Sequence, residues 1–168
     1  MHTFQPADTS ILEFNPFNKI GKDWMLVTAG DEQKANTMTA SWGGMGVMWG
    51  CDVVFVFIRQ TRYTKEFIDK TGKFSLSFPM EQYRREMKIL GALSGRNEDK
   101  IGQCGVHVGY HNGIPYIDEA NLVITCTVMS ATELTMDQLV EKGIEKEWYG
   151  DGNLHTMYIA KIEDVLVR

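Results

Sequence analysis

Residues 53–58 (Val-Val-Phe-Val-Phe-Ile) form the longest apolar run in the chain, and every one of them is β-branched or aromatic. Such side chains favour strands. Asp52 and Arg59 bound the run, and a short continuous apolar segment is typical of a central strand buried on both faces. A membrane-spanning helix needs roughly 20 apolar residues. The sequence therefore predicts a β-protein without a membrane-spanning segment, and its first residues lack the apolar stretch of a signal peptide.

Five further segments have the alternation or the β-branched content of strands: residues 24–29, 36–42, 73–78, 121–132 and 155–167. The last two exceed the usual strand length of about 5–6 residues, which indicates barrel strands that bend. In residues 36–42 the hydroxyls of Thr37, Thr39 and Ser41 share one face. Residues 43–46 (Gly-Gly-Met-Gly) follow, and we expect them to break or bulge the path.

Helical signals are short. Residues 63–70 follow Thr61 and contain Thr64, and either threonine is a suitable helix cap. Residues 80–90 have the apolar stripe of an amphipathic surface helix, and residues 135–148 allow one or two helical turns. Many strands with a few short surface helices predict a mainly β fold, a closed or nearly closed barrel.

Composition agrees with one globular domain. A chain of 168 residues fits roughly one domain, so we expect a single domain over residues 1–168. Lys and Arg number 17 against 22 Asp and Glu, a net charge of −5, whereas a nucleic-acid interface needs a basic face. We expect neither a nucleic-acid nor a membrane partner. Three irregularly spaced cysteines favour reduced thiols and a cytoplasmic location.

The spacing of Cys104, His107 and His111 superficially fits metal ligation. Neighbouring glycines oppose a helix that would aim the two histidines together, and the fourth ligand of a structural zinc site is not evident. We expect no metal at this segment.

Residues 59–64 (Arg-Gln-Thr-Arg-Tyr-Thr) directly follow the central strand and open a helix. Two guanidiniums, two threonine hydroxyls and the free N–H groups of a helix start suit a phosphate group. The alternative is an ordinary strand end followed by a threonine cap.

Two other segments have polar groups suited to a ligand. The hydroxyl face of residues 36–42 could bond a polar heterocycle, or it could be the solvated face of an ordinary antiparallel strand. Ser94 and Gly95 can present backbone donors and Lys100 a cation, although a solvated loop explains them equally. No dinucleotide-binding glycine fingerprint, phosphate-binding P-loop or nucleophile elbow is present.

Taken together, these segments resemble the flavin reductase-like family of FMN-binding split barrels, which includes flavoredoxin. The matching pieces occur in the family's order over nearly the whole chain: Asn-Thr-Met-Thr-Ala-Ser-Trp at 36–42, Arg-x-x-Arg-Tyr-Thr at 59–64, Phe-Ser-Leu-Ser-Phe at 74–78, Ser-Gly-Arg at 94–96 with Lys100, and His-Thr-Met-Tyr-Ile at 155–159. Each piece is weak alone, and the five in order are specific for the family but not for one reaction.

The resemblance implies a Greek-key-like split β-barrel homodimer with FMN at or near the subunit interface and NAD(P)H as co-substrate. FMN is favoured over FAD because two arginines suit a terminal phosphate. The phosphate would be held by Arg59, Thr61, Arg62 and Thr64. The ribityl chain and ring would be lined by Thr37, Met38, Thr39 and Ser41, and Trp42 and Tyr63 belong to the same cofactor-binding motifs.

The resemblance also implies roles at the ring. Ser94, Gly95 and Lys100 would approach its pyrimidine end and stabilise negative charge there. His155 would lie close to the flavin or the nicotinamide, as a proton source or as a strand residue with a satisfied hydrogen bond. Gln60 stands where the family often has proline, so we expect a less rigid loop.

Several activities remain open at this point. The favoured one is an NAD(P)H-dependent flavin reductase that passes electrons to an acceptor. The alternatives are a flavoredoxin-like electron carrier with a redox partner protein, a non-catalytic barrel for a phosphorylated ligand, and a split barrel acting on haem or pyridoxamine phosphate.

Overall fold

The computed structural model describes residues 1–168. The strands are β1 (Gln5–Ala7), β2 (Met25–Gly30), β3 (Ala35–Ala40), β4 (Gly43–Met48), β5 (Cys51–Arg59), β6 (Lys73–Pro79), β7 (Val108–His111), β8 (Ile114–Ile117), β9 (Ala120–Glu133) and β10 (His155–Val167). The α-helices are α1 (Pro16–Gly21), α2 (Tyr63–Thr71), α3 (Arg84–Ala92), α4 (Lys100–Cys104) and α5 (Ile144–Trp148). Short 3-10 turns occupy Thr9–Ile11, Glu81–Tyr83 and Met136–Gln138.

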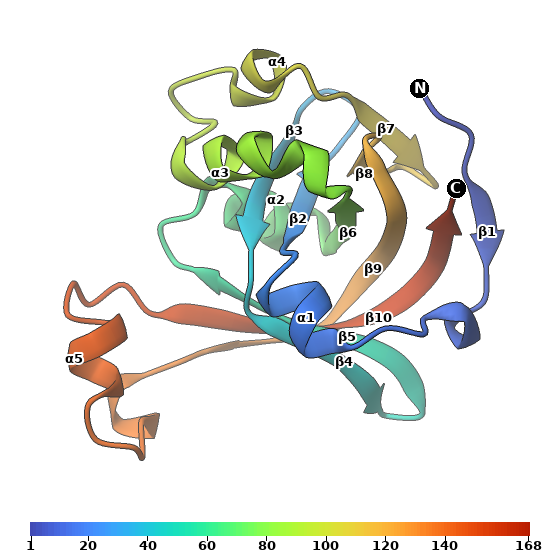
Figure 1. Cartoon of the computed structure of the whole chain (residues 1–168). Helices are drawn as coiled ribbons and strands as arrows, with labels where there is room; N and C mark the ends of the chain where they lie inside the picture. Colours follow the sequence, from blue (N-terminus) through green and yellow to red (C-terminus); the bar gives the residue numbers. More distant parts are fainter.

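One antiparallel sheet forms the body of the molecule, with the strand order β3-β2-β6-β9-β10-β5-β4 and with β1 added beside β10. Figure 1 shows this sheet curling round, with α3 and α4 gathered at one end and α1 below them. β7 and β8 form a separate hairpin. The mainly β fold with short helices that the sequence predicts is therefore confirmed.

The curled sheet encloses a single large apolar core. Its fully buried side chains come from strands distant in sequence, including Phe74 and Phe78 of β6, Ile124 of β9 and Tyr158 of β10. Because alternate residues of a strand point to opposite faces, each of these strands contributes every second residue to this interior. The core fixes the strand ends that carry the candidate site.

β5 matches the expected central strand fully on one face and in part on the other. Val54, Val56 and Ile58 are fully buried in the core. On the opposite face Val53 is also fully buried, but Phe55 and Phe57 are only half-buried. The expectation of burial on both faces therefore holds for only part of that face. The glycine-rich residues 43–46 do not merely interrupt the path, because they form most of β4, which pairs with β5 in register.

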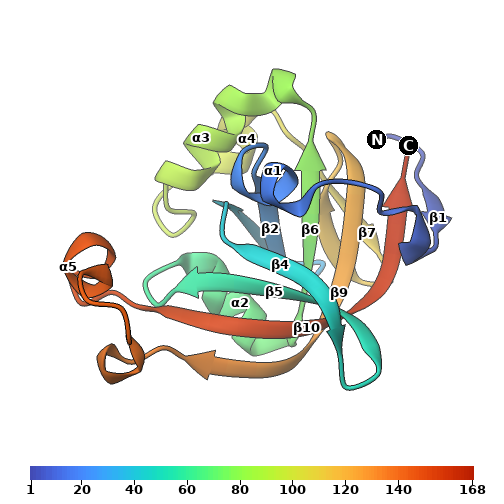
Figure 2. The same cartoon turned by 60° about the horizontal axis from the view of Figure 1, so that its bottom comes forward.

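β9 and β10 are long, as the sequence predicts, and their pairing shifts register at Ile159/Ala160 and at Ile162/Asp164. Such irregularities bend strands. Residues 134–154 connect the two strands and are called the arm below. Figure 2 shows the arm, with α5, projecting away from the barrel.

The helices differ in detail from the sequence-based expectation. α2 ends at the expected place, with Gly72 at φ 66°, the left-handed geometry that glycine adopts easily. Its N-cap is Arg62, without a side-chain cap bond, so neither Thr61 nor Thr64 caps it. The segment around residue 80 begins as a 3-10 turn, and α3 starts only at Arg84. No helix is long and apolar enough to cross a membrane.

Candidate functional site

A hollow of about 270 Å³ lies where β3, β5, α2 and β10 meet the arm. Seven of the sequence-predicted positions lie in it: Met38, Thr39, Ser41, Trp42, Arg59, Arg62 and His155. Ala40, Phe57 and Trp148 complete its lining. Three separate motifs of the sequence thus converge on one place.

The chain path explains why aromatic rings gather here. After β3 ends at Ala40, Ser41 and Trp42 connect it to β4. The Trp42 ring lies 4.8 Å from the His155 ring and 5.1 Å from the Trp148 ring, measured between centroids. These three rings form a π-rich wall beside the two arginines.

Arg62 is the least neutralised charge of the hollow. Its Nη1 donates to the carbonyl oxygen of Gly91 at 2.6 Å, and it forms no ion pair with a carboxylate. Burial, and then the neighbouring charge of Arg59, lower the pKa of Arg62. A partly buried cation without an anion costs free energy, so this position favours an anionic ligand.

Arg59 holds the arm. Its guanidinium donates to the carbonyl oxygens of Trp148 at 2.9 Å and Asn153 at 3.3 Å, and it pairs with Asp151 at 3.3 Å. It also lies over the ring of Tyr149. Its position beside Arg62 fits the predicted phosphate site, although most of its donors already have partners within the chain.

His155 is buried and bonded. Its Nδ1 lies 2.9 Å from the hydroxyl of Tyr149. Burial, followed by the charges of Arg59 and Arg62, lowers the pKa of His155 to about 4. The ring is therefore neutral near pH 7, which agrees with a strand residue holding a satisfied hydrogen bond and does not favour a proton donor at that pH.

The rest of the 59–64 motif surrounds the start of α2. The Thr61 hydroxyl accepts from Nδ2 of Asn153 at 2.8 Å, at the exposed edge of the site. The cations of Lys34 and Arg96 both lie over the ring of Tyr63. Thr64 is fully buried and its hydroxyl accepts from Nδ2 of Asn36, so a ligand could reach Thr64 only through a rearrangement.

Gln60 is fastened more firmly than expected. Its backbone N–H donates to the carbonyl oxygen of Leu154, and its side chain donates to the hydroxyl of Thr156. A proline could not make the first of these bonds. The residue that departs from the family pattern thus ties the loop to β10.

The hydroxyl face of β3 packs under the helices instead of facing solvent. Thr37 is fully buried and bonded to Thr28 and to the carbonyl of Val27. It lines none of the hollows described here, so its predicted contact with a cofactor stays a prediction. Thr39 donates to the carbonyl oxygen of Met87 at 2.5 Å.

Thr39, Ala40 and Ser41 also line a second hollow of about 260 Å³, together with Trp24, Met87, Lys88 and Gly91. The two hollows therefore adjoin along the end of β3. An added Cβ on Gly91 would lie 3.1 Å from the Thr39 side chain, so a glycine at this point keeps α3 close to β3.

The segment around residue 95 opens on a different hollow. Gly95 and Lys100 line a hollow of about 490 Å³ together with residues 33–36, and none of its lining residues is shared with the hollow at His155. The ammonium of Lys100 is buried and donates to the carbonyl oxygens of Leu90 and Leu93. It fastens the end of α3, so its predicted contact with a cofactor ring stays a prediction.

Sequence reasoning missed the arm. Trp148 and Phe57 line the hollow, and Tyr149, Asp151 and Asn153 position Arg59 and His155. The cluster Trp148-Tyr149 followed closely by His155 is an aromatic signal that could have indicated it. Among the metal candidates, His107 pairs with Glu119 and His111 with Asp164, and no group of three His, Cys, Asp or Glu side chains is placed to hold a metal ion.

Comparison with known proteins identifies the family. Residues 17–168 match the flavin reductase like domain. The chain therefore belongs to the flavin reductase-like family, whose solved relatives share its split-barrel fold.

Individual relatives are moderately similar. An uncharacterized protein of Escherichia coli K12, YddH, is 32% identical over 113 residues, which cover 64% of this chain but only 59% of that protein. The flavoredoxin of Desulfovibrio vulgaris (Miyazaki F) is 27% identical, with a TM-score of 0.66 over 86% of this chain and 69% of the flavoredoxin. The FMN-binding protein from Thermus thermophilus is 21% identical, with a TM-score of 0.68 over the whole of this chain and 82% of its own. The last of these is evidence for the fold alone.

Proposed function

We propose that the chain binds FMN at the β3–α2–β10 hollow and works as an NAD(P)H-dependent flavin oxidoreductase. One observation supports this most strongly: Arg62, a partly buried cation without an anionic partner, lies beside a second arginine and a wall of aromatic rings. A phosphate ester attached to an aromatic ring system satisfies both features with one molecule. Membership of a flavin-handling family supports the same conclusion.

The residues present fit FMN. Cofactor pockets usually measure about 300–1,000 Å³. The hollow of about 270 Å³ lies just below that range, and the hollow of about 260 Å³ adjoins it. Arginine is suited to bidentate phosphate bonds, and the hydroxyl of Ser41 lies between the two hollows. We propose that Arg62, Arg59 and Thr61 hold the phosphate and that Met38, Thr39 and Ser41 line the rest of the cofactor.

When bound, FMN supplies a ring that accepts a hydride from a nicotinamide. The chain's own contribution is positional and electrostatic. Burial, followed by the charges of Arg59 and Arg62, lowers the pKa of His155 and keeps its ring neutral, while Trp42 and Trp148 line one side of the hollow. A neutral imidazole beside Tyr149 can donate or accept a hydrogen bond to a bound ligand through Nε2 without adding charge.

We also propose that the working unit is a homodimer. Phe55 and Phe57 of β5 are half-buried, and Met157 lies opposite Phe57 in the register. These side chains form an apolar surface next to the hollow, and apolar surface of this kind is typical of an oligomer interface. A second copy would cover this face and narrow the open side of the hollow. We further propose a cytoplasmic location, because all three cysteines are free thiols.

The experiment that tests this function starts from the freshly purified chain. We expect a yellow protein whose released chromophore is FMN, and anaerobic addition of NADPH or NADH should bleach it. A colourless protein that takes up no added FMN would refute the proposal.

A second candidate is an electron carrier that receives electrons from a protein partner. The 27% identity with a flavoredoxin supports it. This candidate predicts the same yellow protein but no bleaching by either nucleotide, so the anaerobic experiment separates the two.

A further inference from the structure

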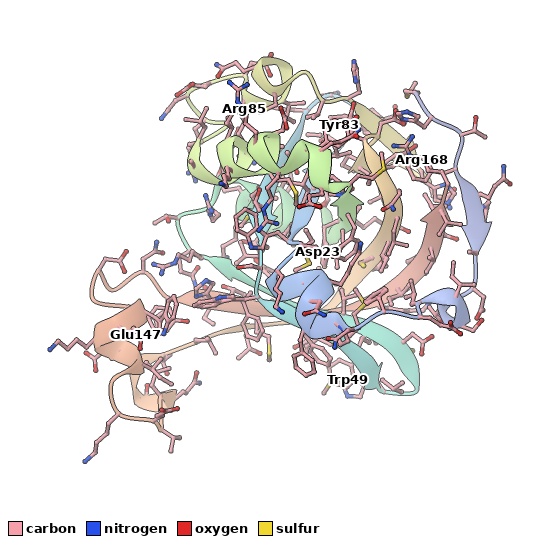
Figure 3. The ribbon with its side chains drawn as sticks, viewed as in Figure 1. Asp23, Trp49, Tyr83, Arg85, Glu147 and Arg168 are labelled. Atoms are coloured by element: carbon pink, nitrogen blue, oxygen red, sulfur yellow. The ribbon has the colours of Figure 1, made fainter.

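A fourth hollow, of about 370 Å³, lies outside the proposed flavin site, between α1 and the start of α3. Its lining includes Lys19, Lys22, Asp23, Glu81, Arg84 and Met87. In Figure 3 the labelled Asp23 lies between these two helices. Three cations and two carboxylates give this hollow a net positive charge in a chain of net charge −5.

The guanidinium of Arg84 is held in place by two contacts. Its guanidinium lies 3.3 Å from the ring centroid of Trp24, and its Nη1 donates to the carbonyl oxygen of Asp23 at 2.7 Å. No carboxylate pairs with it, so its remaining N–H groups are available. A guanidinium fixed flat on an indole has little freedom left to lose when it binds an anion.

Trp24 is held in a costly conformation. Its φ of 69° lies in the left-handed region, which bulky residues rarely adopt. Such strain persists only where the surroundings enforce it, and it gathers at functional sites. Here it presents the indole to Arg84 at the point where β2 begins.

The ammonium groups of the two lysines add positive charge and have few partners within the chain. Lys22 has no ion-pair or hydrogen-bond partner for its ammonium. Lys19 lies over the ring of Phe78, and its nearest carboxylate, that of Asp23, is 3.9 Å away. An incoming anion therefore meets cations that are not neutralised by strong pairs.

This hollow lies near the proposed flavin site, with Met87 between them. The register places Met25 opposite Ala40, so Trp24 stands next to Ser41. Trp24 and Met87 line the hollow that adjoins the flavin site, and Met87 also lines the cationic hollow. A ligand that reaches from Ser41 past Trp24 arrives at Arg84.

Resting on the proposed function, we propose that Arg84, Lys19 and Lys22 bind phosphate groups of the nicotinamide dinucleotide that reduces the flavin. The nicotinamide end reaches the proposed flavin site, and the phosphates extend past Trp24 to the cationic hollow. Arg84 supplies bidentate donors, and the lysines supply point charges. This explains how a chain without a dinucleotide-binding glycine fingerprint takes such a substrate.

The test measures binding of NADP⁺ and NAD⁺ to the oxidised, FMN-loaded protein by calorimetry at low salt, so that no turnover is needed. We expect Arg84→Gln to weaken at least one dinucleotide about tenfold, because hydrogen bonds to charged groups contribute roughly 1.5–3 kcal/mol. The matched control is Arg85→Gln, an exposed neighbour on the same helix that does not line the hollow. Figure 3 labels Arg85 on α3.

Lys22→Glu is a second variant, chosen because Lys22 is exposed and its substitution should leave the fold intact. We expect it to weaken the same dinucleotide severalfold. If only the affinity for NADP⁺ falls, the hollow binds the 2′-phosphate. If the affinity for NAD⁺ falls as well, the hollow binds the pyrophosphate. Either result supports the proposal.

Unchanged affinities in both Arg84→Gln and Lys22→Glu would overturn it. The proposal would also be overturned if these substitutions weakened the binding of inorganic phosphate but not of either dinucleotide. The hollow would then be a site for a free anion. A wild-type protein that binds FMN but neither dinucleotide would also overturn it while leaving FMN binding intact. Failure of FMN uptake, by contrast, would refute the proposed function itself.

Discussion

Arg59→Lys tests whether one side chain holds the arm against the barrel. Arg59 bonds the backbone carbonyls of Trp148 and Asn153 and the carboxylate of Asp151. A lysine keeps the charge but cannot reach both carbonyls from one nitrogen. Charged hydrogen bonds contribute roughly 1.5–3 kcal/mol. Because the Arg59 side chain is 29% exposed, we discount this to about 1–2 kcal/mol for local opening of the arm.

Hydrogen exchange read by mass spectrometry measures that opening directly. A loss of about 1–2 kcal/mol speeds exchange of residues 148–154 about 5- to 30-fold, with core strands unaffected. The matched control is Asp151→Asn. Because the Asp151 side chain is 62% exposed, its ion pair contributes at most about 1 kcal/mol. Unchanged exchange in Arg59→Lys, or an equal increase in Asp151→Asn, would refute this reasoning.

Three other predictions follow from single contacts. Burial lowers the pKa of His155 to about 4 from 6.5. The stability that depends on its neutral ring is therefore complete above about pH 6.5 and is lost as the pH falls toward 4. A titration midpoint of His155 near 6.5, measured by NMR, would contradict this. Lys100→Met should lower the free energy of unfolding by about 1–3 kcal/mol, because the carbonyls of Leu90 and Leu93 lose their donor. An unchanged midpoint of urea unfolding would contradict this and would show that water replaces the ammonium without cost. Gly95→Ala should shift its loop, because the new Cβ would lie 2.0 Å from Oδ1 of Asn36, and it should raise loop exchange with little effect on the barrel core; an unaltered loop would contradict the close contact.

The strands could be predicted well from the sequence because their signals are local. The run at residues 53–58 and the long segments before and after the arm appear as β5, β9 and β10. What failed depended on neighbours distant in sequence. Phe57 is only half-buried. α2 lacks a side-chain cap because its N-cap position falls on Arg62, whose guanidinium has no acceptor atom.

The candidate site could be predicted in part. Residue types identified the two arginines and the end of β3, and the structure brings these to one hollow. Spacing could not indicate that the Lys100 ammonium turns inward to α3, or that Thr37 faces Thr28. Such pairings depend on how helices pack on the sheet, which no local pattern encodes.

The central claim is that the arginines at the end of β5 bind the phosphate of a flavin. It is tested most directly by comparing the dissociation constants of FMN and riboflavin for the wild-type protein and for Arg62→Gln. We expect the wild type to bind FMN at least tenfold more tightly than riboflavin, as a charged hydrogen bond of roughly 1.5–3 kcal/mol implies, and we expect Arg62→Gln to remove most of that preference while riboflavin binding stays the same. Equal affinities for the two flavins in the wild type, or an undiminished preference in the variant, would contradict the account.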